Sequence, residues 1–578
     1  MAYAYQNQRR ICVPVPQFFV DLRSPIPSAG FFPGSFPVVN PNPSFSHPAP
    51  PVQVLVPNTR PVIASGRYFW NPAFFIRMEE ERNRSLHQFM VEEGLVPSQE
   101  DELKRKYAIE QLKEIVQVWV KKVAWQRRLP KNEIARAGAT ILTYGSYGLG
   151  VHGPESDIDA LCVGPAFATI AEDFFIVLHN MLQSRPEVSE IHCVKNAKVP
   201  LMRFKFNGIS IDLPYAQLSV LSVPENVDLS NPFFLHRIDE TSLRSLSGVH
   251  ANMRILQLVP NLGVLFELFS LMNFQSMLRC VKLWAKRRGV YSHLLGFLGG
   301  IHLAILAAFI CQRHPTLSVS ALIPIFFDTF SHWPWPMPVI LQDGLIPFRE
   351  VPDSRSFMPI RMPCRPFDWC NSNITSSTFN KIRTELLRGH AIMSRDLTRP
   401  DFEWSSLFDP FPYTHRYTRF ARIFLSAPDE DELWDWVGWV KSRFRSLLLK
   451  LEELQGFCDP NPIEFVEHDV AEPNTVFYWG LSSNGRSSID MDSLKEEFMK
   501  SVENGDQGSG CRLELTIVNS QQLPKNAQFY CLSEKDSKAY WRIPDYCRPR
   551  QPVYSQHLPH YCVGYVSNNR VEHPNDGG

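Results

Sequence analysis

Three aspartates and a glycine–serine turn are the residues of this 578-residue chain whose types and spacing could do chemistry. Asp157 and Asp159 stand two residues apart in a segment, SDIDALCVG, that has the composition of a β-strand. Side chains two apart in a strand point to the same face, so the two carboxylates lie side by side while Ile158 turns into the core. Two like charges at that distance raise each other's pKa, and a divalent cation would neutralise them. Paired oxygen ligands suit Mg²⁺, which keeps its other positions for water and phosphate oxygens.

The turn that precedes this strand can hold an anion. Gly145 lets the backbone come close to a phosphate, and Ser146, separated from Asp157 by ten residues, offers an N–H and a hydroxyl donor. A third carboxylate, Asp212, lies in the strand-like segment ISIDL, whose apolar residues face the opposite way. Each element alone is common on solvated strand ends, but together they predict a site for phosphoryl transfer. No GxxxxGK[ST] segment is present, which excludes a Walker P-loop.

Apolar periodicity predicts the elements that must position these side chains. Residues 78–95 and 100–128 read as helices that precede the turn, and residues 172–184 read as a helix that follows the aspartate strand. Alternating segments at 201–206 and 209–213 read as strands. The expected apolar face of the second helix consists of Ala108, Leu112, Ile115, Val116, Trp119 and Val120.

Beyond about residue 236 the chain becomes largely helical. Residues 294–311 form an uncharged run of 18 residues, but three glycines and His302 within it favour a buried helix over 301–311 rather than a membrane span. Residues 430–455 read as one amphipathic helix, and residues 511–519 alternate as a strand does. The expected apolar face of this later helix consists of Val440, Phe444, Leu447, Leu448 and Leu451.

These patterns predict an α+β multidomain fold. The expected parts are a disordered, proline-rich arm at 1–62, a catalytic domain at 63–235, a helical central domain at 236–370, a smaller α+β domain at 371–545 and a tail at 546–578. The arm holds 13 prolines and a single acidic residue, a composition typical of disordered or polyproline-II segments.

The charge balance limits how nucleic acid can bind. Lys plus Arg total 59 and Asp plus Glu total 59, so the formal net charge is zero. That excludes a broad basic surface for nonspecific coating of nucleic acid and confines any RNA contact to local patches. The 12 cysteines include no CxxC pair, which excludes zinc-ribbon and thioredoxin-like sites.

The aspartate segment carries a family resemblance. GSYGLGVHGPESDIDALCVGP resembles the signature of the eukaryotic poly(A) polymerases of plant nuclear type, within the DNA-polymerase-β-like nucleotidyltransferase superfamily. Later blocks resemble that family in the same order, over roughly residues 85–465: VPLMRFKFNGISIDLPYA, SLRSLSGVH, VKLWAKRRGVYSHLLGFLGGIHLAIL and WVGWVKSRFRSLLLKLE. The resemblance implies a polymerase-β-like nucleotidyltransferase domain, a helical central domain and an RNA-binding, RRM-like α+β C-terminal domain.

The reaction that the resemblance implies is template-independent addition of AMP from ATP to RNA 3′ ends by a two-metal mechanism. It implies that Asp157, Asp159 and Asp212 are catalytic and hold two Mg²⁺ ions, for which Mn²⁺ can substitute. The residues implied to bind ATP are Tyr144, Gly145, Ser146, Asp157, Asp159, Asp212, Lys282, Tyr291, Gly300 and Ile301. RNA contact by the C-terminal domain is implied by the resemblance only, because no RNP aromatic pair is recognisable there.

Several positions depart from the family pattern. Tyr144 stands where Phe is common, and Pro214 stands where Leu is common. The family segment RSLNG-x-R reads RSLSGVH here, so that Ser247 replaces Asn and His250 replaces Arg. Gly148 stands where Arg is common. We expect the changes at Gly148 and His250 each to remove a positive charge near the phosphates.

The resemblance also implies partners and a compartment. The expected partners are ATP, an RNA 3′ end and cleavage and polyadenylation factors, with no membrane and a monomeric chain. The family implies the nucleus, while the lack of a C-terminal basic import cluster leaves the cytoplasm open. Two alternatives stay open: another terminal nucleotidyltransferase, uridylyl- or CCA-adding, and an RNA-binding regulator with a weakened site. Lys286, Arg287 and Arg288 are expected either as a solvated basic helix end or as contacts to the RNA backbone.

Overall fold

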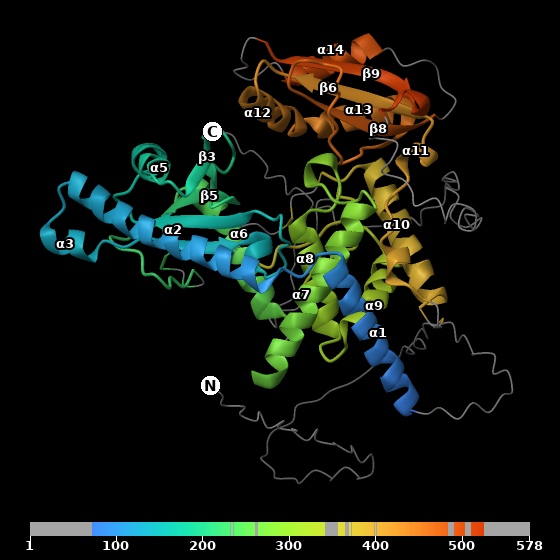
Figure 1. Cartoon of the computed structure of the whole chain (residues 1–578), viewed down its shortest axis with the longest axis horizontal. Helices are drawn as coiled ribbons and strands as arrows, with labels where there is room; N and C mark the ends of the chain where they lie inside the picture. The colour runs from blue at the N-terminus through green and yellow to red at the C-terminus, as the bar shows by residue number, and fades with distance from the viewer. Residues whose placement is uncertain are drawn as a thin grey trace, which may run out of the picture. The chain divides into compact units, whose positions relative to one another are not determined.

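The computed structural model describes residues 72–524, apart from residues 230, 232, 235, 260–263, 342–355, 365–368, 371–372, 398, 400–401, 484–490 and 503–509. The arm predicted at 1–62 and the tail predicted at 546–578 lie outside the described residues. The described residues contain a five-stranded sheet and a four-stranded sheet, separated along the chain by a run of helices (Figure 1).

The five-stranded sheet carries the predicted aspartates. Its strand order is β1-β2-β5-β4-β3, and all neighbouring strands are antiparallel except β2 and β5, which are parallel. The predicted strands on either side of the glycine-rich turn and at 201–206 and 209–213 are therefore confirmed. The strands are β1 (Thr140–Tyr144), β2 (Ile158–Gly164), β3 (Val188–Val194), β4 (Leu201–Phe206) and β5 (Ile209–Gln217).

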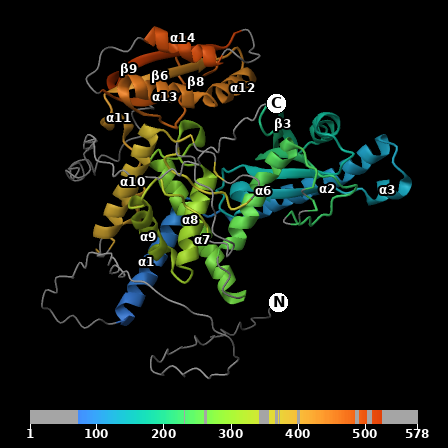
Figure 2. The ribbon, with the colours of Figure 1, turned by 180° about the vertical axis from the view of Figure 1, so that it is seen from behind.

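Helices cover both faces of this sheet. On one face lie α2 (Gln99–Gln126), a π-helical segment (Ile170–Leu178) and α5 (His179–Gln183), and on the other lies α6 (Glu240–Leu258). Figure 1 shows α2 in front of the strands, and the reverse view in Figure 2 shows α6 in front. The strand period divides the side chains between the two faces, because Ile158 and Ala160 pack toward α2 whereas Leu161 and Val163 pack toward α6. All six predicted apolar residues of α2 are buried.

The packing of α6 and of α1 (Pro72–Glu92) bears on the domain boundaries. Leu246 and Val249 of α6 share an apolar cluster with Leu161 of β2. Leu86 and Met90 of α1 instead join the apolar core of the helices that follow α6. The boundary expected at 235 stays a prediction, and we propose to move it to the end of α6 because that helix completes the sheet's second face.

Four long helices follow α6: α7 (Val264–Arg287), α8 (Gly300–Arg313), α9 (Val319–Ser331) and α10 (Ser376–Arg395). The helix predicted at 301–311 within the uncharged run is confirmed as the central part of α8, which has ten buried residues from His302 to Cys311. None of the described helices is long and apolar enough to cross a membrane.

The four-stranded sheet has the order β7-β8-β6-β9, with all neighbours antiparallel. Along the chain its elements run strand, two helices, two strands, helix, strand, which is the ferredoxin-like β-α-β-β-α-β topology. The elements are β6 (Arg419–Ser426), α12 (Glu430–Lys441), α13 (Phe444–Gln455), β7 (Gly456–Asp459), β8 (Asn474–Ser483), α14 (Met491–Val502) and β9 (Arg512–Asn519).

The prediction of a single helix at 430–455 is wrong, because the helix is interrupted between Lys441, the end of α12, and Phe444, the start of α13. The Trp439 carbonyl accepts hydrogen bonds from Ser442 Oγ at 2.6 Å and from Arg443 Nη1 at 3.1 Å. The Arg443 amide bonds instead to the Val440 carbonyl, in a tighter turn. Side-chain donors thus replace the helical amide at this carbonyl. The apolar residues predicted for this segment are all buried.

One face of the four-stranded sheet is covered by aromatic side chains. Phe420 and Phe424 of β6 and Tyr478 of β8 share an apolar cluster with Tyr417 and Phe465 from the flanking segments. These rings are buried against one another, so this face does not offer the open aromatic platform on which RRM domains stack bases. That agrees with the lack of an RNP aromatic pair in the sequence.

Candidate active site

A row of four residues crosses the five-stranded sheet at the site. Tyr144 on β1 pairs with Asp159 on β2, Asp159 pairs with Asp212 on β5, and Asp212 pairs with Arg203 on β4. Residues paired across neighbouring strands present their side chains on the same face. This is the face that α6 covers, since Tyr144 packs in the α6 cluster. The sheet register therefore brings two aspartates, 53 positions apart in the chain, next to each other.

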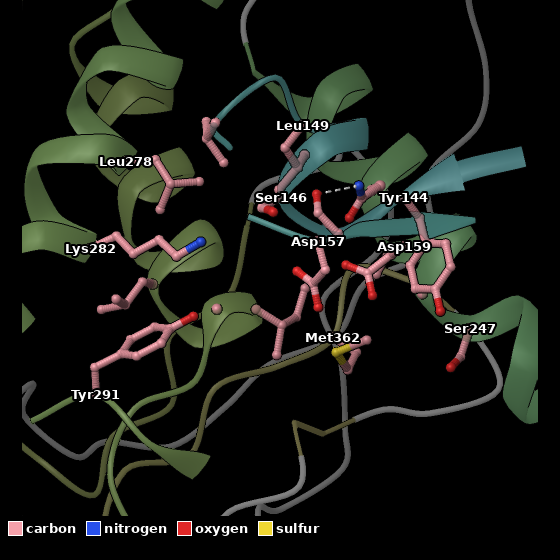
Figure 3. Close-up of a pocket in the computed structure, with 18 residues that line it drawn as sticks. Tyr144, Ser146, Leu149, Asp157, Asp159, Ser247, Leu278, Lys282, Tyr291 and Met362 are labelled. Carbon is pink, nitrogen blue, oxygen red and sulfur yellow. Dashed lines mark hydrogen bonds between the residues drawn. The ribbon is translucent and has the colours of Figure 1, made fainter. Parts of the chain in front are cut away.

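Asp157, Asp159 and Asp212 form one carboxylate cluster. One oxygen from each lies within 4.8 Å of the others. Burial and the charges of Asp157 and Asp212 raise the pKa of Asp159 from 3.8 to about 7. A divalent cation relieves both causes, because it replaces lost hydration and neutralises the mutual repulsion. The donor set of three hard carboxylate oxygens fits such an ion, and the three predicted ligands lie together as expected. Figure 3 shows two of them, Asp157 and Asp159, at the cavity.

Arg203 was not among the predicted site residues. Its Nε and Nη2 donate to the two oxygens of Asp212, each at 2.5 Å, so that the guanidinium forms a fork on this carboxylate. Asp212 is only 9% exposed beneath it. The alternation of residues 201–206 could have indicated Arg203. Met202 and Phe204 pack toward α2, so Arg203 between them lies on the opposite, carboxylate-bearing face of the strand.

Gly145 is required by the closeness of the turn to Asp159. Its φ is +61°, a left-handed conformation that other residues adopt at a cost. A Cβ at this position would lie 1.9 Å from Asp159 Oδ2. Gly248 of α6 serves a similar purpose, since a Cβ there would lie 2.6 Å from the Tyr144 ring. Both glycines allow backbone to approach the row of site residues.

Side chains from α6 and α7 hold the glycine-rich turn in place through its carbonyls. Asn252 Nδ2 donates to the Gly145 carbonyl at 3.0 Å, drawn as the dashed line in Figure 3. Gln275 donates to the carbonyl of Leu149 at 3.1 Å, and Arg279 donates to that of Gly150 at 2.5 Å. The first residues of the turn form a short helical turn, α4 (Gly145–Gly148).

The wall opposite the carboxylates comes from α7 and the start of α8. Lys282 lines it, and burial followed by the nearby Lys286 lowers the pKa of its ammonium group. The Tyr291 hydroxyl points toward the cavity in Figure 3, and burial raises the pKa of this phenol. Gly300 and Ile301 line the wall as the first residues of α8, where unpaired amides and the helix dipole favour an anion.

These two walls enclose a cavity of about 400 Å³, a volume typical of small-molecule sites. Of the ten predicted site residues, all of them described, only Asp212, which accepts the two hydrogen bonds from Arg203, is not part of the lining. The sequence did not predict the remaining apolar part of the lining, which comes from several elements and consists of Leu149, Val151, Ala251, Leu278, Leu303 and Met362.

The structure shows where three of the family departures lie. His250 does not face the cavity: it is 7% exposed, hydrogen bonds to the backbone of Leu229, and burial lowers the pKa of its imidazole. Gly148 lies outside the lining as well, and a Cβ there would lie 2.8 Å from the Thr143 carbonyl oxygen. Ser247 does line the cavity, although its hydroxyl donates to the Arg244 carbonyl of its own helix.

Neither expectation for the basic cluster at the end of α7 describes it fully. Arg288 is buried and donates to the carboxylate of Glu385 at 2.6 and 3.1 Å. Arg287 pairs with Glu93 of the segment after α1. Lys286 is exposed, and its ammonium lies 5.8 Å from the centre of the Tyr291 ring. Of these three residues, Lys286 alone forms no ion pair with a carboxylate of the described residues.

A mixed five-stranded sheet with paired carboxylates beside a glycine–serine turn defines a nucleotidyltransferase of the polymerase-β-like type. The poly(A) polymerase nucleotidyltransferase domain family matches residues 77–259, and the poly(A) polymerase central domain family matches residues 273–410. The chain belongs to the poly(A) polymerase family. The first match ends one residue after α6, which agrees with the packing of that helix on the sheet.

Named relatives support this family. Nuclear poly(A) polymerase 3 of Arabidopsis thaliana is 56% identical over 84% of this chain and 94% of its own length. Nuclear poly(A) polymerase 4 of the same plant is 39% identical over 69% of this chain and 54% of its own length. Poly(A) polymerase of Dictyostelium discoideum is 37% identical over 72% of this chain and 52% of its own length. The chain thus spans nearly the whole of the first relative and about half of the other two.

Proposed function

We propose that this chain is a polynucleotide adenylyltransferase that adds AMP from ATP to RNA 3′ ends without a template. The observation that carries the proposal is the convergence of Asp157, Asp159 and Asp212 on one side of a nucleotide-sized cavity and of Lys282 and the start of α8 on the other. The names and coverage of the relatives support adenylate as the transferred group.

The three aspartates would hold two Mg²⁺ ions, or Mn²⁺ in their place. When bound, such ions lower the pKa of an attacking hydroxyl and neutralise charge on a leaving pyrophosphate. The exposed Asp157 and the deeper Asp159 present their oxygens to the cavity, whereas Asp212 reaches the cluster from beneath Arg203. Arg203 fixes the orientation of the Asp212 carboxylate through two hydrogen bonds.

The protein groups around the cavity have roles of their own in binding ATP. Lys282 places an ammonium group opposite the aspartates, where it neutralises triphosphate charge. Gly145 and Ser146 bring backbone and hydroxyl donors beside the same region. Tyr291 and the apolar lining suit an aromatic base, because they exclude water from one side of the cavity. We assign Tyr144, Gly300 and Ile301 to ATP contact on the same grounds.

The remaining functional assignments rest on the family. We propose an RNA 3′ end as second substrate, contact with cleavage and polyadenylation factors, a monomeric chain and a nuclear location, since several relatives are named nuclear. RNA contact by the ferredoxin-like domain would use a surface other than the face that its own aromatic rings cover. The complete carboxylate cluster favours an active enzyme over a weakened RNA-binding regulator.

Primer extension tests this proposal directly. The purified full chain is incubated with an oligo(A) primer, Mg²⁺ and one nucleoside triphosphate at a time. We expect long products with ATP and little extension with UTP, CTP or GTP. Equal extension with UTP would favour a uridylyltransferase, and no extension with any nucleotide, by protein that still binds the primer, would favour the regulator.

A further inference from the structure

A second cluster of metal-ligating side chains lies far along the chain from the aspartates, between α9 and α10 (Figure 1). Asp328 belongs to the last turn of α9, His332 directly follows this helix, and His390 belongs to α10. One ligand atom from each of the three residues lies within 4.8 Å of the others. None of the three belongs to the cavity lining described above.

The backbone places these residues together because α9 and α10 approach each other closely at this point. A Cβ on Gly389 would lie 2.3 Å from the Phe327 ring, so only glycine allows this contact. Gly389 directly precedes His390, and Phe327 directly precedes Asp328. Asp328 and His390 are therefore carried by two helices in close contact, with His332 at the end of the first, and helices position ligands better than loops do.

The hydrogen bonds around the first imidazole leave a nitrogen for a ligand. His332 Nδ1 lies 2.9 Å from the Asp328 carbonyl oxygen and 3.1 Å from Ser331 Oγ, so a proton on Nδ1 has an acceptor in the backbone carbonyl or in this hydroxyl. That tautomer leaves Nε2 with its lone pair, which is the form of histidine that binds metals. A backbone carbonyl is a common outer partner of a metal-bound imidazole, since it fixes both tautomer and ring orientation.

The second imidazole and the carboxylate make only long side-chain contacts. Both ring nitrogens of His390 lie 3.3–3.4 Å from Ser394 Oγ, whose hydroxyl donates to the His390 carbonyl at 2.7 Å. His390 Nδ1 lies 3.4 Å from Asp328 Oδ1, and His332 Nδ1 lies 3.3 Å from the same oxygen. Both distances exceed those of strong charge-assisted hydrogen bonds. Within the described parts of the chain, no lysine or arginine is recorded in an ion pair with Asp328. The two rings meet edge to face with their centres 4.7 Å apart.

We propose that Asp328, His332 and His390 form a binding site for a borderline divalent transition-metal ion of the Zn²⁺ class. Two imidazole nitrogens and one carboxylate oxygen are a ligand set that such ions take, with water in the remaining position. Mg²⁺ would not be selected, because it prefers oxygen ligands throughout. The Asp328 and His332 side chains are 65% and 60% exposed, so they can close the last fraction of an ångström around an ion.

Zn²⁺ titration of the full chain by calorimetry, with excess Mg²⁺ present to occupy the aspartate cluster, tests this site. We expect one Zn²⁺ per chain at the proposed site, with an affinity that falls by about tenfold or more in His390→Gln and in Asp328→Asn. The matched control is His415→Gln, which removes an exposed histidine at the end of α11 (Tyr413–Arg416) and should leave the affinity unchanged. Substituted Co²⁺ should give the visible absorption of an ion bound through imidazole, and His390→Gln should lose it.

The possible outcomes separate the proposal from a plain hydrogen-bonded pair of histidines. Equal Zn²⁺ affinity in wild type, His390→Gln and His415→Gln would overturn the proposal, and so would the absence of Zn²⁺ binding beyond the aspartate cluster. Melting of each variant in EDTA should match wild type, because the substituted side chains lie near the surface. If Asp328→Asn melts early, His332→Gln provides the same test without touching the carboxylate.

Discussion

Asp159 and Asp212 occupy paired positions on the neighbouring parallel strands β2 and β5. This pairing turns two weak sequence signals into one cluster with Asp157, and it sets the electrostatics of the site. The two carboxylates differ in one respect: Arg203 forms a fork on Asp212, whereas Asp159 has no recorded ion-pair partner among the described residues. The predictions below follow from this asymmetry and from the tight packing around it.

The first prediction is that the metal-free protein loses stability at Asp159 as pH rises. The folded pKa of Asp159, about 7, lies above the unfolded value of 3.8, so folding favours the protonated acid. The free energy of unfolding therefore falls as pH rises between those two values and stays low above about pH 7. Asp159→Asn removes this loss. In EDTA, the melting temperature of the variant minus that of wild type should increase between about pH 5 and about pH 8.

Asp212→Asn is the matched control for that experiment. Removing the charge of Asp212 leaves Arg203 without its fork partner, so this variant should be no more stable than wild type at either pH. A gain in stability of the same size in both variants would show that simple charge repulsion, and not the Arg203 contact, determines the behaviour of the cluster.

Gly145→Ala should damage the site more than the fold. The left-handed φ costs about 1–2 kcal/mol for alanine, and the new Cβ must displace the carboxylate of Asp159. We expect a modest drop in melting temperature but a large loss of kcat in primer extension. Gly438→Ala in α12 serves as control, since a Cβ there meets nothing within 4 Å. Near-normal kcat for Gly145→Ala would mean that the turn can move away from Asp159 without consequence.

Gly148→Arg should weaken the enzyme, although the family pattern alone suggests that arginine here would strengthen ATP binding. A Cβ at 148 would lie 2.8 Å from the Thr143 carbonyl oxygen and 2.9 Å from Asn252 Nδ2, the atom that holds the Gly145 carbonyl. We expect a higher KM for ATP and a smaller stabilisation by Mg-ATP. Ser247→Asn, at a position that lines the cavity, should change both far less. A lower KM in Gly148→Arg would contradict this account of the turn.

How far the sequence predicts this site depends on the physical range of each interaction. The strand period places Asp157 beside Asp159, and the apolar face of α2 follows from helical spacing, because both depend on local geometry. The family resemblance brings in Lys282 and Gly300 from distant segments. The Arg203 fork depends on the register of β4 against β5, which the residues alone do not give.

Two further differences between prediction and structure have the same origin. The break between α12 and α13 follows from competition of Ser442 and Arg443 for one carbonyl, within a segment whose apolar spacing stays helical throughout. His250 replaces a residue expected near phosphate, yet it is buried on α6 next to Leu229, which tertiary packing alone determines. Periodicity indicates which residues are buried, but it does not identify the residues that pack against them.

The central claim is that the three aspartates act in catalysis and do not maintain the fold, and Asp157→Ala tests it most directly because Asp157 is exposed. Primer extension and thermal melting, each with and without Mg-ATP, are measured on the same preparation. We predict a loss of AMP transfer of several orders of magnitude and a reduced stabilisation by Mg-ATP, since only a ligand bound to the folded state raises the melting temperature. Melting in EDTA should be equal to that of wild type or slightly higher, because Asp157 no longer repels Asp159. Near-normal extension, or a loss of activity explained by earlier melting, would contradict the claim.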